Sequence, residues 1–242
     1  MTADDIQGRR AHERVRLSLE VAYRSTGSFL VSYTVDLSRG GLFLETEQPR
    51  SVGSELELRL AIPGANDEVL LTGEVVWIQQ EPAPGKPMGM GVRFTDLERS
   101  FGDVIDGLVK TFSGLRVLVI SGAPRTRAKL VRILRSALAA QYIDADPAKP
   151  LPPEAESGVD LWLVDLQDGS NAAARALLER LLADGAPTAV VAMSSHPRAR
   201  AEAHDLGAHE VVGSPPGSNE IRAAVLRALG RPMLRNTDSE DE

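Results

Sequence analysis

The first half of the chain alternates apolar and polar positions with a period of two. Residues 15–23 read VRLSLEVAY and residues 55–62 read ELELRLAI, so every second side chain is apolar. This period places the apolar side chains of an extended chain on one face, and it indicates half-buried β-strands. Four further strand-like stretches lie between clusters of Gly, Pro, Asn and Ser: residues 29–37, 41–47, 69–79 and 88–94. Six short strands with short connections predict an all-β, six-stranded antiparallel barrel.

The periodicity changes after the barrel. Residues 96–112 carry apolar side chains at helical spacing, which predicts a helix that ends the first domain. Continuous apolar runs then alternate with helical segments: strands at 115–121, 160–166, 188–195 and 210–214, and helices at 124–140, 171–185, 197–207 and 218–230. This alternation predicts an α/β doubly wound, flavodoxin-like domain. One crossover helix is missing, because residues 144–158 contain four prolines, which exclude a long helix.

The chain of 242 residues should therefore contain two domains and a tail. We expect a barrel with its trailing helix at residues 8–112, an α/β domain at residues 115–230 and a disordered acidic tail at residues 231–242. The net charge of −7 argues against a general nucleic-acid binder. The absence of cysteine excludes disulfides and thiolate metal sites, and no apolar stretch approaches the length of a membrane span. A cytoplasmic protein that neither binds DNA nor inserts into membranes is the expectation.

Two charged clusters could hold an anionic ligand. In DLSRGG, residues 36–41, Asp36 and Ser38 lie two apart and lean to the same face of an extended chain, and the glycines let a ligand approach the backbone. GRRAHERVR, residues 8–16, places several arginines just before the first strand. Guanidinium groups bind phosphates or the O6 and N7 edge of guanine in bidentate fashion. A carboxylate accepts from guanine N1–H and N2–H, so the two clusters together suit a guanine dinucleotide.

The same residues resemble the PilZ domain, the bacterial receptor for cyclic di-GMP, in versions found in myxobacteria and their relatives. RAHER fits RxxxR, DLSRGG fits [D/N]xSxxG, and TGEVVWIQ with MGVRF is similar to the closing strands of that module. The resemblance implies that the arginines clasp phosphates and guanine edges, that the Asp and Ser contact a guanine, and that the last glycine keeps the turn open. The implied ligand-binding residues are Arg9, Arg10, Arg14, Asp36, Ser38 and Gly41.

Each motif taken alone has a simpler explanation. A basic arm is typically a solvated tail, and an Asp-x-Ser-Gly turn is typical hairpin chemistry. The two motifs in the right order, on a six-strand pattern, favour ligand binding.

The second domain resembles a response-regulator receiver that has lost its phosphorylation chemistry. Asp165 stands at the phosphoacceptor position and Ser194 at the position of the Thr/Ser. Ser121 and Gly122 replace the acidic pair that should hold Mg²⁺, and Ser214 replaces the lysine before a proline. Phosphoryl transfer depends on those charges. We therefore interpret Asp165 as a phosphoacceptor-like but inactive residue, and the domain as a pseudo-receiver for protein contacts.

No other catalytic pattern is present. The chain has no cysteine nucleophile and no Gly-rich phosphate loop, and His204 and His209 lie five residues apart, which makes them a poor metal pair. We expect no enzyme activity, no metal and no cofactor beyond the ligand itself.

The resulting hypothesis is a cyclic di-GMP-binding signalling adaptor. Its N-terminal Arg arm would become ordered over the ligand, and the pseudo-receiver would contact an unidentified protein partner, with a homodimer left open. The first alternative is a PilZ-like interaction scaffold, in motility or polarity regulation, that does not bind the nucleotide. The second alternative is a genuine phosphorelay receiver.

Overall fold

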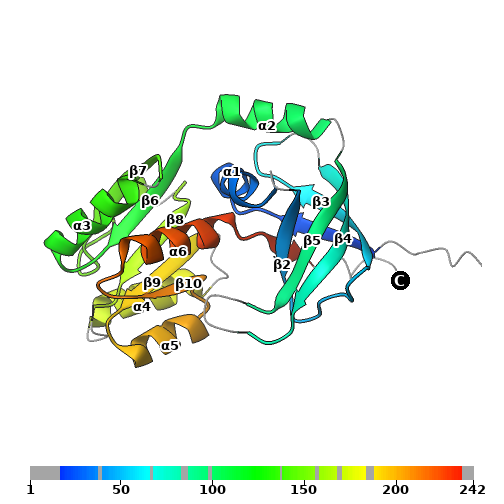
Figure 1. Ribbon diagram of the computed structural model, residues 1–242. Coiled ribbons are helices and arrows are strands. Elements are labelled where there is room, and N and C mark those ends of the chain that lie inside the picture. Colours follow the sequence, from blue (N-terminus) through cyan, green and yellow to red (C-terminus); the bar gives the residue numbers. More distant parts are fainter. Residues whose placement is uncertain are drawn as a thin grey trace, which may run out of the picture.

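A barrel and an α/β domain lie side by side in the computed structural model, with α1 between them (Figure 1). The structure describes residues 17–37, 40–65, 68–82, 87–97, 100–136, 138–155, 158–167, 171–183 and 188–235. The elements of the barrel half are β1 (Leu17–Ala22), α1 (Thr26–Val35), β2 (Gly41–Glu45), β3 (Glu55–Ala61), β4 (Val69–Gln79), β5 (Gly89–Leu97), α2 (Ser100–Thr111) and β11 (Met233–Arg235). The fold class inferred from the two periodicities is confirmed, because a nearly closed barrel precedes a parallel five-stranded α/β sheet.

The barrel sheet is mixed, whereas the sequence pattern predicted a purely antiparallel one. Its strands follow the order β11-β1-β3-β4-β5-β2, and β11 lies near β2, so the sheet nearly closes. β1 and β3 are parallel, while the other neighbouring strands are antiparallel. Parallel strands cannot be joined by a tight hairpin. The connection from β1 to β3 accordingly runs through α1 and β2.

Residues 29–37, predicted as a strand, form most of helix α1 and the turn after it. The helix begins after Ser25, whose side-chain oxygen accepts a hydrogen bond from the backbone N–H of Ser28 (3.0 Å). Apolar side chains lie on opposite sides of the helix. Phe29 packs in the barrel core, and Val31 packs in the core of the α/β domain. A helix that is buried on two opposite sides has no single apolar face, and a short apolar run in it then looks the same as a buried strand. The strand prediction was wrong for this reason.

The last strand of the barrel comes from the far end of the chain. Met233–Arg235 form β11, antiparallel to β1, with Leu234 opposite Val21. The sequence pattern predicts a disordered tail here, because a three-residue strand carries almost no periodic signal of its own. Residues 236–242, which hold the acidic cluster, lie outside the described residues. The α/β domain is therefore inserted between α2 and the final strand of the barrel.

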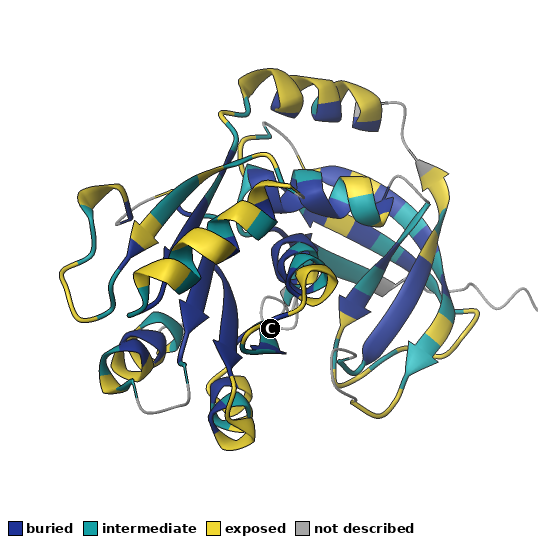
Figure 2. Ribbon diagram, turned by 60° about the vertical axis from the view of Figure 1, so that its left-hand side comes forward, coloured by how far each residue is buried: buried dark blue, intermediate teal, exposed yellow. Residues whose placement is uncertain are grey.

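The α/β domain has a parallel sheet in the order β10-β9-β8-β6-β7. Its elements are β6 (Leu115–Ile120), α3 (Pro124–Arg135), β7 (Ala140–Ala145), β8 (Leu161–Asp165), α4 (Ala172–Leu182), β9 (Ala189–Ser194), α5 (Pro197–Asp205), β10 (Glu210–Gly213) and α6 (Ser218–Gly230). In chain order this arrangement is 5-4-3-1-2, the flavodoxin-like order read in reverse. Side chains of α3 and α6 share one core cluster, and those of α4 and α5 share another, so helices cover both faces. Figure 2 shows the central strands buried and the helices exposed on their outer sides.

Two segments of this domain, the predicted helix at residues 124–140 and the proline-rich segment after it, can be compared with the prediction from the sequence. The predicted helix 124–140 ends at Arg135, and β7 begins at Ala140 at the edge of the sheet, which was missed. In the described part of the proline-rich segment, residues 144–155 and 158, the helical structure is a single 3₁₀ turn, Pro153–Ala155, in line with the effect expected of the four prolines. No helix within the described ranges is long and apolar enough to cross a membrane.

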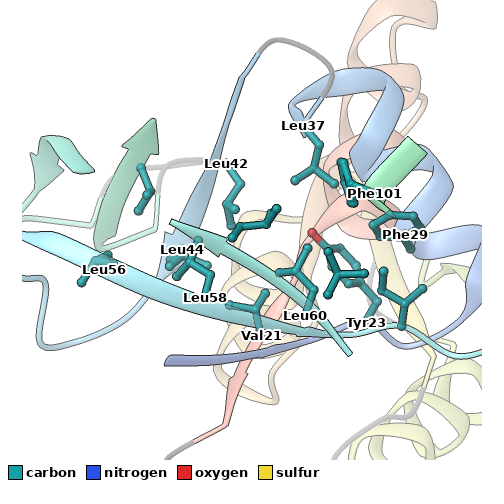
Figure 3. Close-up of a cluster of buried hydrophobic side chains, with 14 of the residues drawn as sticks. Val21, Tyr23, Phe29, Leu37, Leu42, Leu44, Leu56, Leu58, Leu60 and Phe101 are labelled. Carbon is teal, nitrogen blue, oxygen red and sulfur yellow. The ribbon is translucent and has the colours of Figure 1, made fainter. Parts of the chain in front are cut away.

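The barrel core extends onto α1 and the turn that follows it. Figure 3 shows Phe29 and Leu37 among the buried side chains of the strands. The ring of Phe29 meets those of Tyr23 and Phe101 edge to face, at centroid distances of 5.2 and 6.3 Å. Edge-to-face pairs of this kind stabilise a core beyond their buried area. The packing of Leu37 in the barrel core therefore fixes the position of the start of the DLSRGG motif.

Candidate functional site

The described part of the DLSRGG motif forms a tight turn from α1 into β2. Asp36 caps the C-terminus of α1, and its backbone N–H donates to the carbonyl of Ser32 (2.8 Å). The N–H of Gly40 donates to the carbonyl of Leu37 (2.9 Å), and the Gly40 carbonyl accepts from the N–H of Phe94 on β5 (2.7 Å). The turn is thus tied to both the helix before it and the strand beside it. Asp36 itself is exposed, so its carboxylate can meet a ligand.

The two glycines of the turn have different structural roles. Gly40 has a φ of +86°, the left-handed conformation that side chains disfavour. Gly41 lies in β2, and a Cβ there would sit 2.5 Å from the carbonyl oxygen of Val92. Gly41 is therefore required by the close approach of β5, and the bend of the turn is made at Gly40.

The remaining predicted ligand-binding residues cannot be placed. Arg9, Arg10, Arg14 and Ser38 lie outside the described residues. Their convergence with Asp36 on one ligand stays a prediction.

The outer face of β2, β5 and β4 continues from the turn in two rows. The first row contains Gly41, Arg93 and Glu74, which are paired across the strands. The Arg93 guanidinium lies 3.0 Å from the Glu74 carboxylate, and its side chain is 63% exposed. An exposed ion pair of this kind is worth little to stability, so Arg93 can exchange its partner for an anionic ligand at small cost.

The second row carries an exposed aromatic pair. The register places Phe43, Gly91 and Trp77 side by side. The rings of Phe43 and Trp77 stack at a centroid distance of 5.2 Å and an angle of 14°. Gly91 makes this possible, because a Cβ there would come within 2.0 Å of the indole nitrogen. With Trp77 48% exposed, the indole offers a flat apolar surface on this outer face, with β5 between it and β2.

These residues were missed by the sequence analysis. Trp77 and Arg93 were assigned to strands without a role of their own. The available signal was an outward-facing Trp on a strand that pairs with a Gly-x-Gly segment, residues 89–91, since glycine in a strand marks a close approach of other groups.

Asp165, the phosphoacceptor-like residue, is buried at the end of β8 and accepts a hydrogen bond at each carboxylate oxygen. Its Oδ2 accepts from the Ser121 hydroxyl (2.7 Å), and its Oδ1 accepts from the backbone N–H of Gln167 (3.0 Å). Only 2% of its surface is exposed. The Ser194 hydroxyl is directed elsewhere and donates to the Gln167 carbonyl (2.7 Å). The carboxylate thus links the ends of β6 and β8.

The residues at the other receiver positions, Ser121, Gly122 and Ser214, carry no charge. Ser121 and Gly122 follow β6, and the Ser214 N–H donates to the Ser194 carbonyl (3.1 Å). Among the described residues, no group of three His, Asp or Glu side chains is placed to hold a metal ion.

A polar cluster joins the two domains beside β10. Arg24, which follows β1, donates from Nη1 to the Arg231 carbonyl (2.9 Å), and its Nη2 lies 2.8 Å from His209 Nε2. Arg231, which follows α6, binds Glu45 of β2 at 3.1 Å and Glu210 of β10 at 3.4 Å. One arginine therefore bridges a carboxylate from each domain.

His209 in this cluster is neutral near pH 7. Its Nδ1 lies 3.0 Å from the backbone N–H of Val190, while Nε2 faces Arg24. A neutral imidazole accepts at only one nitrogen, and a protonated ring would have no acceptor at either. Burial, then the charges of Arg24 and Arg231, lower the pKa of His209 to about 3. Burial and the neighbouring Arg231 also lower the pKa of Arg24 to about 10, which leaves the guanidinium charged.

Comparisons with known proteins give one family match and several similar solved structures. A protein-family model described as the PilZ domain matches residues 8–110. Among solved structures, the chain is similar to a response regulator receiver domain protein from Clostridium thermocellum (17% identity, 48% of this chain and 94% of that one, TM-score 0.42). It is also similar to a response regulator from Thermotoga maritima (17% identity, 48% and 98%, TM-score 0.39).

A third similar structure is the signal receiver domain of an HD domain-containing protein from Pseudomonas fluorescens (20% identity, 48% and 94%, TM-score 0.40). A search of curated proteins gave no match. The chain therefore carries a PilZ domain at residues 8–110, followed by an α/β domain with the flavodoxin-like strand order.

Proposed function

We propose that the protein is a cyclic di-GMP-responsive signalling adaptor. The barrel binds the dinucleotide, and the α/β domain passes the bound state to a protein partner. The observation that carries the proposal is the position of the turn at residues 36–41. It lies at the end of an outer barrel face that also presents Arg93 and the stacked pair of Phe43 and Trp77. A carboxylate, a guanidinium and a stacking surface within one face are the groups that recognise a guanine nucleotide.

The arginines before β1 complete the site in this proposal. Arg10 and Arg14, with Arg9 as a helper, would close over the phosphates and guanine edges, while Asp36 and Ser38 accept from a guanine. Ordering the arm costs about 1–2 kcal/mol per residue in backbone entropy. Charge-assisted hydrogen bonds contribute about 1.5–3 kcal/mol each, so several of them offset the ordering of a short arm.

The aromatic pair adds a stacking partner that the motifs do not contain. The Trp77 indole is already held parallel to Phe43, so a base that stacks on its free face restricts no further side chain. Base–aromatic stacking is worth about 1–3 kcal/mol per base. Trp77 is thus the residue of this chain that we add to the predicted ligand set.

The α/β domain acts without phosphorylation in this proposal. Both carboxylate oxygens of Asp165 are engaged by Ser121 and Gln167. A phosphoryl group on Asp165 would displace these bonds and meet no metal-binding acidic pair. The domain would then work through protein contacts, and the protein as a whole would be a cytoplasmic adaptor without enzyme activity.

One observation favours the scaffold alternative. The two domains share helix α1, and β11 returns to the barrel from the α/β domain. They form a joined body that can present a fixed surface whether or not a nucleotide binds. In that case the Arg arm would be dispensable in cells, and Arg14→Ala would leave motility or polarity unchanged.

Isothermal titration of the full chain with cyclic di-GMP tests the proposal. The full chain is needed because a fragment that ends before the α/β domain lacks β11. Wild type should bind, while Arg10→Ala and Asp36→Ala should weaken binding at least tenfold, since each removes a charge-assisted contact of about 1.5–3 kcal/mol. The matched control is Arg125→Ala, because Arg125 is exposed and belongs to α3, a helix on the side of the α/β domain away from the barrel (Figure 1). An absence of heat at high micromolar ligand, or equal affinity in all variants, would refute nucleotide binding.

A further inference from the structure

Helix α1 belongs to both domains at once. Phe29 and Tyr33 pack into the barrel core, and Val31 and Val35 pack into the core of the α/β domain. The Ser28 hydroxyl, which is buried, donates to the carbonyl of Leu229 on α6 (2.5 Å). Figure 1 shows α1 between the barrel and α6. A change in the position of α1 therefore reaches both cores.

The N-terminal end of α1 is bound to the α/β sheet. The Ser25 hydroxyl donates to Asp160 Oδ1 (2.5 Å), while the same oxygen caps the helix by accepting from the Ser28 N–H. Asp160 Oδ2 accepts from the backbone N–H of Arg116 on β6 (2.8 Å). One carboxylate thus joins the first turn of α1 to the start of β6.

Helix α1 and the α/β domain are closely packed against each other. A Cβ on Gly27 would lie 2.5 Å from a methyl carbon of Leu115 and 3.0 Å from an oxygen of Asp160. Where α6 crosses α1, a Cβ on Gly230 would lie 3.4 Å from the backbone of Ser32. Close-packed surfaces of this kind do not compress, so they transmit a displacement.

The C-terminal end of α1 leads directly into the motif turn. Asp36 caps the helix, and Leu37 is buried in the barrel core. The Tyr23 hydroxyl, whose pKa is raised by burial and by the nearby Asp36 charge, shares a hydrogen bond of 3.2 Å with Ser32, midway along the helix. The helix has ten residues, which corresponds to a rod about 15 Å long. It joins the candidate ligand turn to α6 and Asp160.

We propose that α1 transmits the state of the motif turn, as set at Asp36 and Gly40, to α6 and to the start of β6. A ligand that repositions Asp36 moves the end of a rigid helix, and the helix responds along its tightly packed contact with α6. The signal received by the partner would then be an altered α6 surface on the α/β domain. The identity of the ligand as cyclic di-GMP rests on the proposed function. The mechanical link between the motif turn and α6 does not depend on it.

Hydrogen exchange of the full chain measures this link with and without ligand. In the first arm, cyclic di-GMP should change the exchange of amides in residues 221–230 of α6 about fivefold or more, which is the lower range of typical coupling between sites. In the second arm no ligand is added. Gly40→Ala strains the turn, because a side chain is placed at a φ of +86°, and the same α6 amides should respond.

Gly53→Ala is the matched control for the second arm. Gly53 has the same φ of +86° and equally open surroundings, but it lies in the connection between β2 and β3. If Gly40→Ala fails to fold, Asp36→Ala replaces it, since Asp36 is exposed. The inference is overturned if α6 exchange is the same in the Gly40 and Gly53 variants and, where ligand binds, is unchanged by it. A chain that binds no cyclic di-GMP but shows the Gly40 effect refutes the proposed ligand and supports the link.

Discussion

Leu234 lies opposite Val21 in the antiparallel ladder between β11 and β1. A strand that follows the α/β domain in the sequence thus completes the barrel that precedes it. Arg231, just before this strand, binds Glu45 in the barrel and Glu210 in the α/β domain. The two domains are therefore joined by a strand, a helix and a bridging arginine, and they should unfold together.

The first prediction concerns this strand. A chain that ends at Pro232 lacks β11 and leaves the edge of β1 unpaired. We expect a loss of about 2 kcal/mol in the free energy of unfolding from the missing strand hydrogen bonds and the packing of Leu234. For a chain of this length the loss corresponds to about 4–8 °C in Tm. Thermal unfolding followed by circular dichroism measures it, and a single transition is expected.

A chain that ends at Arg235 is the control. It removes the acidic residues 236–242 but keeps β11, so its Tm should equal that of the full chain. Equal melting of both truncated chains would show that β11 contributes nothing to the barrel.

The second prediction concerns Trp77 and follows from its exposure on the outer face of the barrel. Trp77→Ala should weaken cyclic di-GMP binding about tenfold to a hundredfold, because stacking on a base is worth about 1–3 kcal/mol. Its side chain is half exposed, so stability should change little. Titration calorimetry gives the affinity. Tryptophan fluorescence gives an independent signal, since the second of the two tryptophans, Trp162, is buried in the α/β domain.

Fluorescence of the variants separates stacking from an indirect effect. In wild type, ligand should quench the emission of Trp77. In Trp77→Phe the quenching should vanish while much of the affinity remains, because Phe also stacks. Quenching that persists in Trp77→Phe would place the ligand away from the aromatic pair.

The sequence allowed the fold class to be predicted because most elements show a clear period. β4 and α6 were placed with the same bounds that the structure shows, since each is long and bounded by Gly or Pro. The errors occur where long-range contacts decide the local structure. α1 is a helix because it is buried on opposite sides by two domains, and β11 is a strand because β1 needs a partner. The residues that pack on α1, and the strand that pairs with β11, lie far away in the sequence, so local sequence patterns do not reveal these contacts.

The candidate site was predicted only in part, for a similar reason. Motif residues such as Asp36 and Gly41 can be recognised from spacing alone. The stack of Phe43 on Trp77 depends on the register of three strands and on a bulge in β4 between Val75 and Trp77. A register shift of one residue would place Trp77 on the other face, so the sequence could not assign it.

The third prediction concerns pH. Because the pKa of His209 is about 3 in the folded chain and about 6.5 when unfolded, the unfolded state binds a proton first as pH falls. The stability that depends on a neutral His209 is complete above about pH 6.5 and is lost as pH falls toward 3. Between pH 7 and 5 wild type should lose up to about 2 kcal/mol more than His209→Gln.

Urea unfolding at the two pH values measures this difference. His204→Gln is the control, because that side chain is 80% exposed on α5. Equal pH dependence in wild type and His209→Gln would mean that His209 takes up its proton equally well in the folded state.

The fourth prediction concerns Asp165. Acetyl phosphate should not label the wild-type chain. Asp165→Ala should lower the free energy of unfolding by about 1–3 kcal/mol, because it leaves the buried Ser121 hydroxyl and the partly buried Gln167 N–H without their acceptor. Asp165→Asn keeps an oxygen at this position and should cost less. Labelling of wild type that disappears in Asp165→Asn would instead identify a working receiver.

The fifth prediction compares two glycines in helices. Replacing glycine by alanine inside a helix normally stabilises it by about 0.5–1 kcal/mol. Gly107→Ala on α2 should show this gain, because a Cβ there meets no atom within 4 Å. Gly27→Ala on α1 should instead destabilise the chain by about 1–3 kcal/mol, since its Cβ would press on Leu115 and Asp160. Denaturant unfolding of the two variants measures both signs. A gain in stability for Gly27→Ala would mean that α1 and the α/β domain are loosely packed, and the transmission through α1 would lose its physical basis.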